Sequence, residues 1–311
     1  MAKYAGPDKS GGAGDGAGDA GPVRFSVRRM ARLLQVSSSG YYAHARRVRA
    51  PQPAPRQQRR ADLAVQILDV HAGSGSTYGS PRITAELRDR GERVSAKTVA
   101  SIMAGIGIEG ISPRTFKLRT TIADPAAVFP PDLVRRRFDQ GRPDAVWLTD
   151  ITYLTCGEGD MFLCAILDGH TRRVLGHVVA DRIGSTMVAH AIDTAVACRT
   201  SAGHDVTGTV LHSDRGGEFT GSLTVQACAR HGLRRSMGDT GICWDDSPAE
   251  SFWSTFKHEY YYRHTFATRA ELVAAIDNWI RRYNHERRHS AVGMLSPIRY
   301  EQTLTGTANA A

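Results

Sequence analysis

The sequence predicts an α/β protein in which a mixed five-stranded sheet with flanking helices follows a small all-α region. Three observations support this fold class. Apolar residues recur at helical spacing through the N-terminal third, and the second half opens with strand-like runs separated by short turns. The length of 311 residues allows two domains and a sizeable core.

Charge is distributed unevenly along the chain. The formal net charge is +9, and the segment from Arg24 to Arg119 holds 18 Lys/Arg against 6 Asp/Glu. A basic segment joined to a near-neutral body favours a polyanion-binding module attached to a second domain, because phosphate neutralisation requires clustered cations. A basic surface that serves only solubility is the alternative. The 41% hydrophobic and 23% charged residues exclude a mostly disordered or collagen-like chain.

Cysteine usage and hydropathy exclude further classes of protein. The five cysteines form no CxxC pair and are widely spaced, so neither a zinc knuckle nor a disulfide framework is indicated. No apolar run is long enough to span a membrane, and the N-terminus lacks a signal pattern. We therefore expect a cytoplasmic protein with reduced cysteines and no membrane partner.

The N-terminal third contains the predicted helical region. Residues 1–22 are rich in Gly, Ala and Asp without apolar periodicity, which predicts a disordered tail. Residues 23–119 then carry a helix, a turn and a helix, followed by three short helices marked by Leu63, Ile67, Val70, Ile83, Leu87, Val99, Ile102 and Met103. Such helices with surplus arginine are typical of a helix-turn-helix DNA-binding region; a small basic helical bundle is the alternative.

The rest of the chain is the predicted α/β domain, residues 145–303, between a proline-bearing linker (120–144) and a C-terminal tail (304–311). In the linker, Leu133 to Phe138 is expected to cover an edge of this domain. Strand-like runs at 145–155, 161–168 and 173–179 predict an antiparallel meander, and a helix, a strand at 209–212, a helix, a strand at 233–237 and two helices follow. The order βββαβαβαα is that of the ribonuclease-H-like fold.

Two aspartates occupy positions that suit a functional site. Asp150 lies in the middle of the first apolar strand, where a lone carboxylate is costly unless it is paired, hydrogen-bonded or bound to metal. Asp214 directly follows the fourth strand, and ligand sites of open sheets lie at the carboxyl ends of strands. Taken singly, an Asp at either position is more often structural, and Asp214 also suits a plain turn before glycines.

Glu250 stands in the first turn of a predicted helix. A capping box beginning at Ser247 would explain it, yet Lys257 lies seven residues later on the same face, opposite the expected buried stripe of Phe252 and Phe256. Hard divalent cations such as Mg²⁺ or Mn²⁺ take oxygen ligands, and two or three carboxylates plus substrate phosphate suffice to hold them. Two such ions can assist an in-line phosphoryl displacement.

The spacing of these carboxylates resembles a known pattern. Asp150 and Asp214 are followed by Glu250 with 35 residues between the last two, which resembles the D,D(35)E pattern of integrase-type DDE transposases. The segments VWLTDITYL, LHSDRGGEFT, CWDDSPAESFWSTFKHE and YNHERRHSAVGMLSPIRYE are similar, in order and spacing, to IS3-family insertion-sequence transposases, the downstream reading-frame product. YGSPRITAELRDRG resembles the helix-turn-helix segment that precedes the core in that family.

The resemblance, which covers about residues 26–303, implies a function and a site. It implies a ribonuclease-H-like core in which Asp150, Asp214 and Glu250 hold two Mg²⁺ ions, with Mn²⁺ able to substitute. Water, and then a DNA 3′-hydroxyl, would attack phosphodiesters at the terminal inverted repeats and in the target DNA. DNA contacts are expected from Lys257, His212, Arg287, Arg288, Arg82 and Lys97; a solvated Arg-rich helix end is the alternative for Arg287 and Arg288.

The resemblance also implies partners. These are double-stranded DNA, a homo-oligomer formed on that DNA, and a separately encoded upstream reading-frame protein or its fusion, with the protein associated with the nucleoid. The sequence departs from the family at Glu218, Asp245 and Asp246, which add carboxylates near the site.

Two other functions are alternatives to a transposase for this sequence. A retroviral-type integrase is disfavoured because residues 25–120 contain no cysteine for a zinc module. A non-catalytic DNA-binding regulator derived from a transposase is the remaining alternative.

Overall fold

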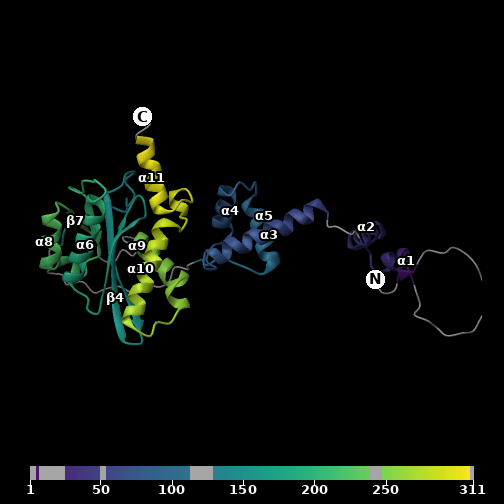
Figure 1. Ribbon diagram of the computed structural model, residues 1–311, viewed down its shortest axis with the longest axis horizontal. Helices are drawn as coiled ribbons and strands as arrows, with labels where there is room; N and C mark the ends of the chain where they lie inside the picture. Colours follow the sequence, from purple (N-terminus) through teal and green to yellow (C-terminus); the bar gives the residue numbers. More distant parts are fainter. Residues whose placement is uncertain (1–4, 7–24, 50–53, 113–128, 239–246, 309–311) are drawn as a thin grey trace, which may run out of the picture. The chain divides into compact units, whose positions relative to one another are not determined.

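The computed structural model describes residues 5–6, 25–49, 54–112, 129–238 and 247–308 (Figure 1). The chain divides into two compact units, Met1–Leu68 and Asp69–Ala311, and each is described by itself.

The first unit carries short helical elements. Strands β1 (Ala5–Gly6) and β2 (Phe25–Ser26) pair in parallel, and helices α1 (Val27–Leu33) and α2 (Ser38–Arg49) follow. This confirms the predicted helix, turn and helix. The side chain of Ser26 caps α1 by accepting a hydrogen bond from the backbone N–H of Arg29 at 3.2 Å. Apart from residues 5–6, the predicted tail lies outside the described residues.

Three helices follow, as predicted. The long helix α3 (Pro55–Gly73) runs from the first unit into the second, where α4 (Ser80–Asp89) and α5 (Ala96–Ile106) contact one another. Pro81 occupies the first turn of α4, and the Ser95 side chain caps α5 by accepting from the N–H of Thr98. The predicted apolar residues of α4 and α5 are buried, namely Ile83, Leu87, Val99, Ile102 and Met103.

The sheet of the second unit has five strands. They are β3 (Val146–Cys156), β4 (Gly159–Asp168), β5 (Val174–Ala180), β6 (Val210–Ser213) and β7 (Arg234–Met237), in the spatial order β5-β4-β3-β6-β7. The first three form the predicted antiparallel meander, while β6 pairs in parallel with both β3 and β7. The mixed five-stranded sheet is therefore confirmed, and β3 lies at its centre.

Helices cover both faces of this sheet (Figure 1). On one face lie α6 (Ser185–Thr200), α7 (Gly217–Thr220) and α8 (Ser222–Arg230), which share a core with Trp147, Ile166 and Leu211 of the strands. On the other face lie α9 (Ser247–Glu259) and α10 (Arg269–His285). Their aromatic residues pack on the strands through Phe252, Phe256, Trp279 and Tyr283. The 3-10 helices η2 (Tyr261–Arg263) and η3 (Ser290–Val292) and helix α11 (Pro297–Ala308) complete the unit.

The linker and the C-terminus are more structured than expected. Val134 is 1% exposed and packs against Val146, Leu148 and Val210, while the N–H of Leu133 donates to Ser236 on the edge strand β7. The Leu133–Phe138 segment thus covers β3, β6 and the edge strand together. Helix α11 continues to Ala308, past residue 303, where the sequence predicted a tail. In the described part of the chain, no helix combines the length and apolar character needed to span a membrane.

Candidate active site

The pairing of β3 with β6 places Asp150 and Asp214 at the same level of the sheet. The register aligns Leu148 with His212, and two residues further along each strand the chain reaches Asp150 and Asp214 respectively. Because the two strands are parallel neighbours, both carboxylates belong to one edge of the sheet, where ligand sites of open sheets form. Asp150 is partly buried within β3, whereas Asp214 is exposed just beyond the end of β6.

Helix α9 brings the third carboxylate to this edge. Trp253 donates its indole N–H to Oδ2 of Asp150 at 2.9 Å, which fixes this face of α9 against β3. Glu250 lies three residues before Trp253, and residues at this spacing share a helix face. Phe252 and Phe256 are 3% and 1% exposed and form the predicted buried stripe. The side chain of Ser247, on which the predicted capping box depends, lies outside the described residues.

The contact of Trp253 with Asp150 is not among the contacts predicted from the sequence. Its signal was present, because an aromatic residue with a polar N–H is buried only where it finds an acceptor. The position three residues after Glu250, on the carboxylate face of α9, would have pointed to Asp150 as that acceptor.

The electrostatics of the site centre on Asp150. Its pKa is raised from 3.8 to about 7, chiefly by burial and next by the charge of Asp214, with a smaller contribution from Glu250. The N–H of Ile151, 2.7 Å from Oδ1, and the indole N–H of Trp253 act in the opposite direction. The like charges of Asp214 and Glu250 therefore both act on Asp150.

A fourth carboxylate lies beside Asp214. Asp214 accepts the N–H of Gly216 at 2.9 Å, which shapes the turn after β6. Glu218, in α7, folds back so closely that a Cβ on Gly216 would stand 2.6 Å from its Oε1. Burial raises the pKa of Glu218, and the charge of Asp214 raises it further. Asp245 and Asp246 lie outside the described residues.

Lys257 brings a cation to the same face of α9. It is half-buried, and burial lowers its pKa while the negative charge of Asp150 works against that shift. Its charge is therefore felt at Asp150, as its position seven residues after Glu250 predicts. Among the described residues it forms no ion pair, which leaves the ammonium available to an anion.

The donor set fits a hard divalent cation in its chemistry. Asp150 is repelled by both Asp214 and Glu250, and a cation with oxygen preference would relieve this repulsion. Within the described ranges, however, no three His, Cys, Asp or Glu side chains gather closely enough to enclose a metal ion by themselves. Mg²⁺ commonly uses one or two carboxylates and takes its remaining ligands from water and substrate phosphate, so pairs of these residues suffice.

The residues expected to contact DNA differ in their exposure to solvent. Lys97 is exposed in the first turn of α5. His212 is 2% exposed in β6, with Nδ1 hydrogen-bonded to Ser236 at 2.9 Å. Arg287 and Arg288 are 7% and 5% exposed, so the alternative of a solvated helix end is wrong for both.

Ion pairs within the chain account for the buried arginines. Arg287 binds both oxygens of Glu259, at 2.7 and 2.6 Å, and Arg82 reaches the same carboxylate at 3.3 Å. Arg288 pairs with Glu86 and Asp89 at 2.5 and 2.6 Å. DNA contact by these three arginines stays a prediction, and their charges already have protein partners. No local pattern indicates that Glu259 is a paired, buried carboxylate, since its partners lie 28 and 177 residues away.

Three protein-family models match parts of the chain. Residues 140–243 and 231–297 match models described as integrase core domain, and residues 57–116 match a model described as HTH-like domain. The first two matches together contain Asp150, Asp214 and Glu250, and the third contains α4 and α5. The fold described above is therefore of the ribonuclease-H-like integrase type, preceded by an HTH-like region.

Named relatives resemble nearly the whole chain. A putative transposase for the insertion sequence element IS986/IS6110 of Mycobacterium tuberculosis is 31% identical over 86% of this chain and 95% of its own length. The transposase InsF for insertion sequence IS3A of Escherichia coli is 32% identical over 90% of this chain and 95% of its own length. Among solved structures, the magnesium complex of the HTLV-2 integrase catalytic core domain has a TM-score of 0.38 at 14% identity, over 51% of this chain and 96% of that one.

Proposed function

The chain belongs to the family of insertion-sequence transposases that includes the IS3 and IS986/IS6110 proteins, and we propose that Asp150, Asp214 and Glu250 are its catalytic carboxylates. It is a DNA transposase, an enzyme of the polynucleotidyl transferase class. The observation that carries the site assignment is geometric: the parallel register of β3 and β6 brings Asp150 and Asp214 to one end of the sheet, and the hydrogen bond from Trp253 to Asp150 holds the helix of Glu250 beside them. Burial, and next the charges of Asp214 and Glu250, raises the pKa of Asp150 to about 7. Such shifts concentrate at functional sites.

The proposed metals are two divalent cations, Mg²⁺ with Mn²⁺ as substitute, held by Asp150, Asp214 and Glu250. When bound, such ions supply charge stabilisation to an in-line displacement at phosphorus. The mutual repulsion of these carboxylates supports this assignment, because a cation would relieve it. Glu218 stands close enough to Asp214 for their charges to interact, so it tunes the charge of the site from beside it.

The chain's own residues then orient the DNA. Trp253 holds the Asp150 carboxylate through its indole N–H, so that Asp150 and Glu250 keep a fixed relation across β3 and α9. Lys257, without an ion pair among the described residues, binds a phosphate of the terminal DNA on this face. Water attacks a phosphodiester at the element's end, and the bond from phosphorus to the 3′-oxygen breaks, which leaves a free 3′-hydroxyl and a 5′-phosphate. This 3′-hydroxyl then attacks a phosphodiester of the target strand, and the 3′-oxygen of the target strand leaves.

The HTH-like region supplies recognition in this proposal. Lys97 projects from the first turn of α5, a position from which a helix-turn-helix protein reaches DNA. The partners are double-stranded DNA with terminal inverted repeats, a further copy of the chain on that DNA, and the upstream reading-frame protein or its fusion. Action on chromosomal DNA places the protein in the cytoplasm at the nucleoid.

The test is strand cleavage and joining on labelled duplexes that carry the inverted repeats flanking the coding sequence. Wild type and Glu250→Gln are compared with Mg²⁺ or Mn²⁺, and the exposed Glu109→Gln serves as the matched control. We expect Glu250→Gln to lose at least about 1000-fold in rate, as the loss of several kcal/mol of charge stabilisation implies, with unchanged DNA affinity. Tight DNA binding without cleavage under either metal would instead identify a non-catalytic regulator.

A further inference from the structure

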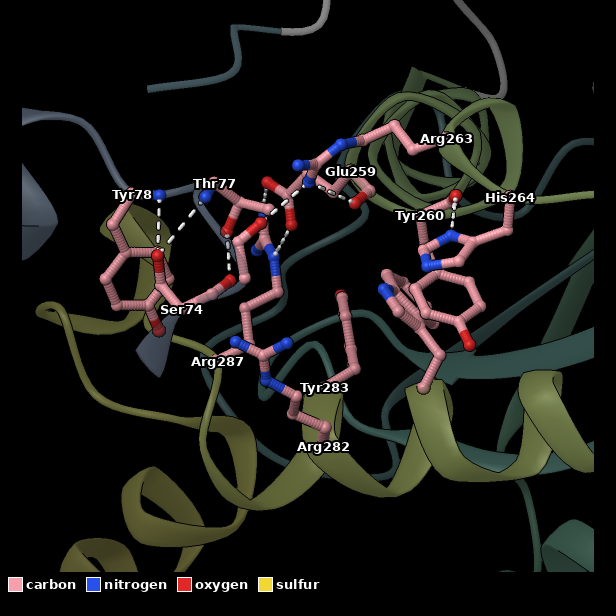
Figure 2. A pocket seen from close by; sticks show the side chains of 12 residues that line it. Ser74, Thr77, Tyr78, Glu259, Tyr260, Arg263, His264, Arg282, Tyr283 and Arg287 are labelled. Carbon is pink, nitrogen blue, oxygen red and sulfur yellow. Dashed lines mark hydrogen bonds and ion pairs between the residues drawn. The ribbon is translucent and has the colours of Figure 1, made fainter. Parts of the chain in front are cut away.

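Glu259 is the last residue of the helix that carries Glu250, and it is almost completely buried. It is 4% exposed, and two arginines from distant parts of the chain share its carboxylate. Arg287 binds it through two hydrogen bonds, and Arg82 of α4 approaches Oε1. Figure 2 shows Glu259 and Arg287 joined beside Tyr78 and Tyr283, around a pocket lined by the segment between α3 and α4 and by residues of α9 and α10.

A second set of contacts holds the far end of α4. Arg288 binds Glu86 through Nε and Asp89 through Nη2, while its backbone N–H donates to the hydroxyl of Tyr78 at 2.8 Å. Tyr78 in turn donates to the carbonyl of Glu286 at 3.3 Å. Because Arg82 lies in the first turn of α4 and Asp89 is its last residue, the helix is held along its whole length.

The charges in this cluster leave little freedom for another arrangement. Two guanidiniums share the single carboxylate of Glu259, and His289 beside them stays neutral. Burial, followed by the charges of Arg287 and Arg82, lowers the pKa of His289 well below its ordinary value. Buried ion pairs of this kind contribute little net stability but penalise every geometry in which one partner is lost. The cluster therefore defines a position more than it adds stability.

Helix α4 connects this cluster to the helix proposed to read DNA. The two helices contact one another, and the guanidinium of Arg88 donates to the carbonyl of Val94, just before α5 begins. On the other side, α9 carries any displacement of Glu259 rigidly to Trp253 and Glu250, nine residues or roughly 14 Å away along the helix. A continuous path of contacts thus runs from α5 through α4 and Glu259 to the catalytic carboxylates.

From this path we propose that Glu259 is a positioning residue that sets the distance between the DNA read by α5 and the phosphodiester cut at Asp150, Asp214 and Glu250. The inference rests on the proposed function. It also gives Arg82, Arg287 and Arg288 a role within the protein, in place of DNA contact. If Glu259 has this role, the ion pairs around it determine where the DNA strand is cut as well as whether it is cut.

The experiment maps the position of cleavage on labelled inverted-repeat duplexes, with Mn²⁺. Glu259→Gln is compared with Glu301→Gln, a matched control, because the half-buried Glu301 also binds two arginines, Arg173 at 2.6 Å and Arg199 at 2.9 Å. Glu301 belongs to α11 and touches neither α4 nor α9 through these pairs. We expect Glu259→Gln to raise the share of cuts at neighbouring phosphodiesters by about tenfold, within the usual range of coupling between sites.

The outcomes separate the two proposals. Cuts by Glu259→Gln at the wild-type position alone, or an equal spread in Glu301→Gln, would overturn the positioning role and leave the transposase reaction intact. Should Glu259→Gln fail to fold, Arg82→Gln replaces it, since Arg82 is the more exposed partner, with 23% of its side chain accessible and a longer contact of 3.3 Å.

Absence of cleavage by the wild type would contradict the proposed function, and hydrogen exchange then tests the positioning role independently. We expect binding of the inverted-repeat duplex to slow amide exchange in α9 of the wild type and of Glu301→Gln. In Glu259→Gln the same duplex should slow α9 exchange less, because only the direct contact at Lys257 then remains. Equal protection in all three proteins would overturn the proposal.

Discussion

The carboxylates at the two ends of α9 differ in their exposure and in their ion pairing. At the first turn, Glu250 is exposed and has no ion pair with any residue that the structure describes, and its charge adds to the crowding around Asp150. At the last turn, Glu259 is buried and its two oxygens accept from Arg287 and Arg82. One helix therefore carries an unsatisfied negative charge at its start and a fully paired one at its end.

The two environments indicate different roles: the carboxylate of Glu250 is suited to bind a ligand, and that of Glu259 is suited to fix a position. An exposed carboxylate that has no cation partner among the described residues is hydrated by water and available to an external cation. A carboxylate that the chain pairs and buries fixes a geometry, and its loss leaves uncompensated charges behind. Substitutions and changes of pH should therefore affect the two ends of α9 differently.

The largest effect on stability is expected at the paired end. Arg287→Ala removes the bidentate partner of a buried carboxylate, and breaking such a pair costs about 3–5 kcal/mol of unfolding free energy. Glu250→Gln, at the exposed end, should change it by less than about 0.5 kcal/mol. Urea unfolding followed by tryptophan fluorescence measures both, and similar losses in the two variants would remove the contrast.

Asp150→Asn is expected to stabilise the metal-free protein while it abolishes cleavage. The folded pKa of about 7 exceeds the ordinary 3.8, so the folded state binds more protons than the unfolded chain between these values. Stability contributed by this group is therefore present at low pH and is lost as pH rises towards 7. At pH 8 in EDTA, thermal unfolding of Asp150→Asn should occur a few degrees higher than wild type. A lower Tm would mean that the carboxylate is not repelled at this site.

The paired end should respond to pH in the opposite direction. Burial, then Arg287 and Arg82, lowers the pKa of His289 well below 6.5. Below pH 6.5 the unfolded chain therefore binds a proton that the folded protein does not, and stability present above this pH is lost as pH falls.

A variant isolates this contribution. Between pH 7 and pH 5, His289→Gln should reduce the slope of unfolding free energy by up to one proton, about 1.36 kcal/mol per pH unit. An unchanged slope would show that His289 is protonated in the folded protein.

The smallest effect is expected at Lys257. Loss of one phosphate contact in Lys257→Gln should weaken DNA binding about equally for all sequences and reduce the salt slope by about 1. Fluorescence anisotropy at several salt concentrations measures this slope, and Lys97→Gln gives the comparison for α5. If Lys257→Gln leaves the slope unchanged while Lys97→Gln lowers it, phosphate binding belongs to the HTH-like region and not to α9.

Local patterns predicted the parts of the structure that depend on local chemistry. The alternation around Asp150 predicted the central strand, and the spacing from Glu250 to Lys257 predicted one helix face. The antiparallel meander was predicted from two short turns, and two helical connections lead to the last two strands. The helices α4 and α5 were marked by Pro81 and Ser95 at their first turns.

Pairings between distant segments could not be predicted in the same way. Arg287 and Arg288 look like a solvated basic helix end in sequence, and nothing near them indicates that Glu259, Glu86 and Asp89 bury them. Similarly, Val134 seals β3 and β6 although it lies in a stretch that reads as a linker. Only the packing of segments that are distant in the sequence decides such contacts.

The most direct test of the contrast between the two ends of α9 is Mn²⁺ binding, measured by electron paramagnetic resonance on the protein with an inverted-repeat duplex. Wild type, Glu250→Gln and Glu259→Gln are compared at equal protein concentration. The account predicts two bound Mn²⁺ ions in wild type and in Glu259→Gln, and the loss of at least one in Glu250→Gln. Equal Mn²⁺ binding by Glu250→Gln and wild type would contradict the assignment of the exposed end of α9 to the metal site.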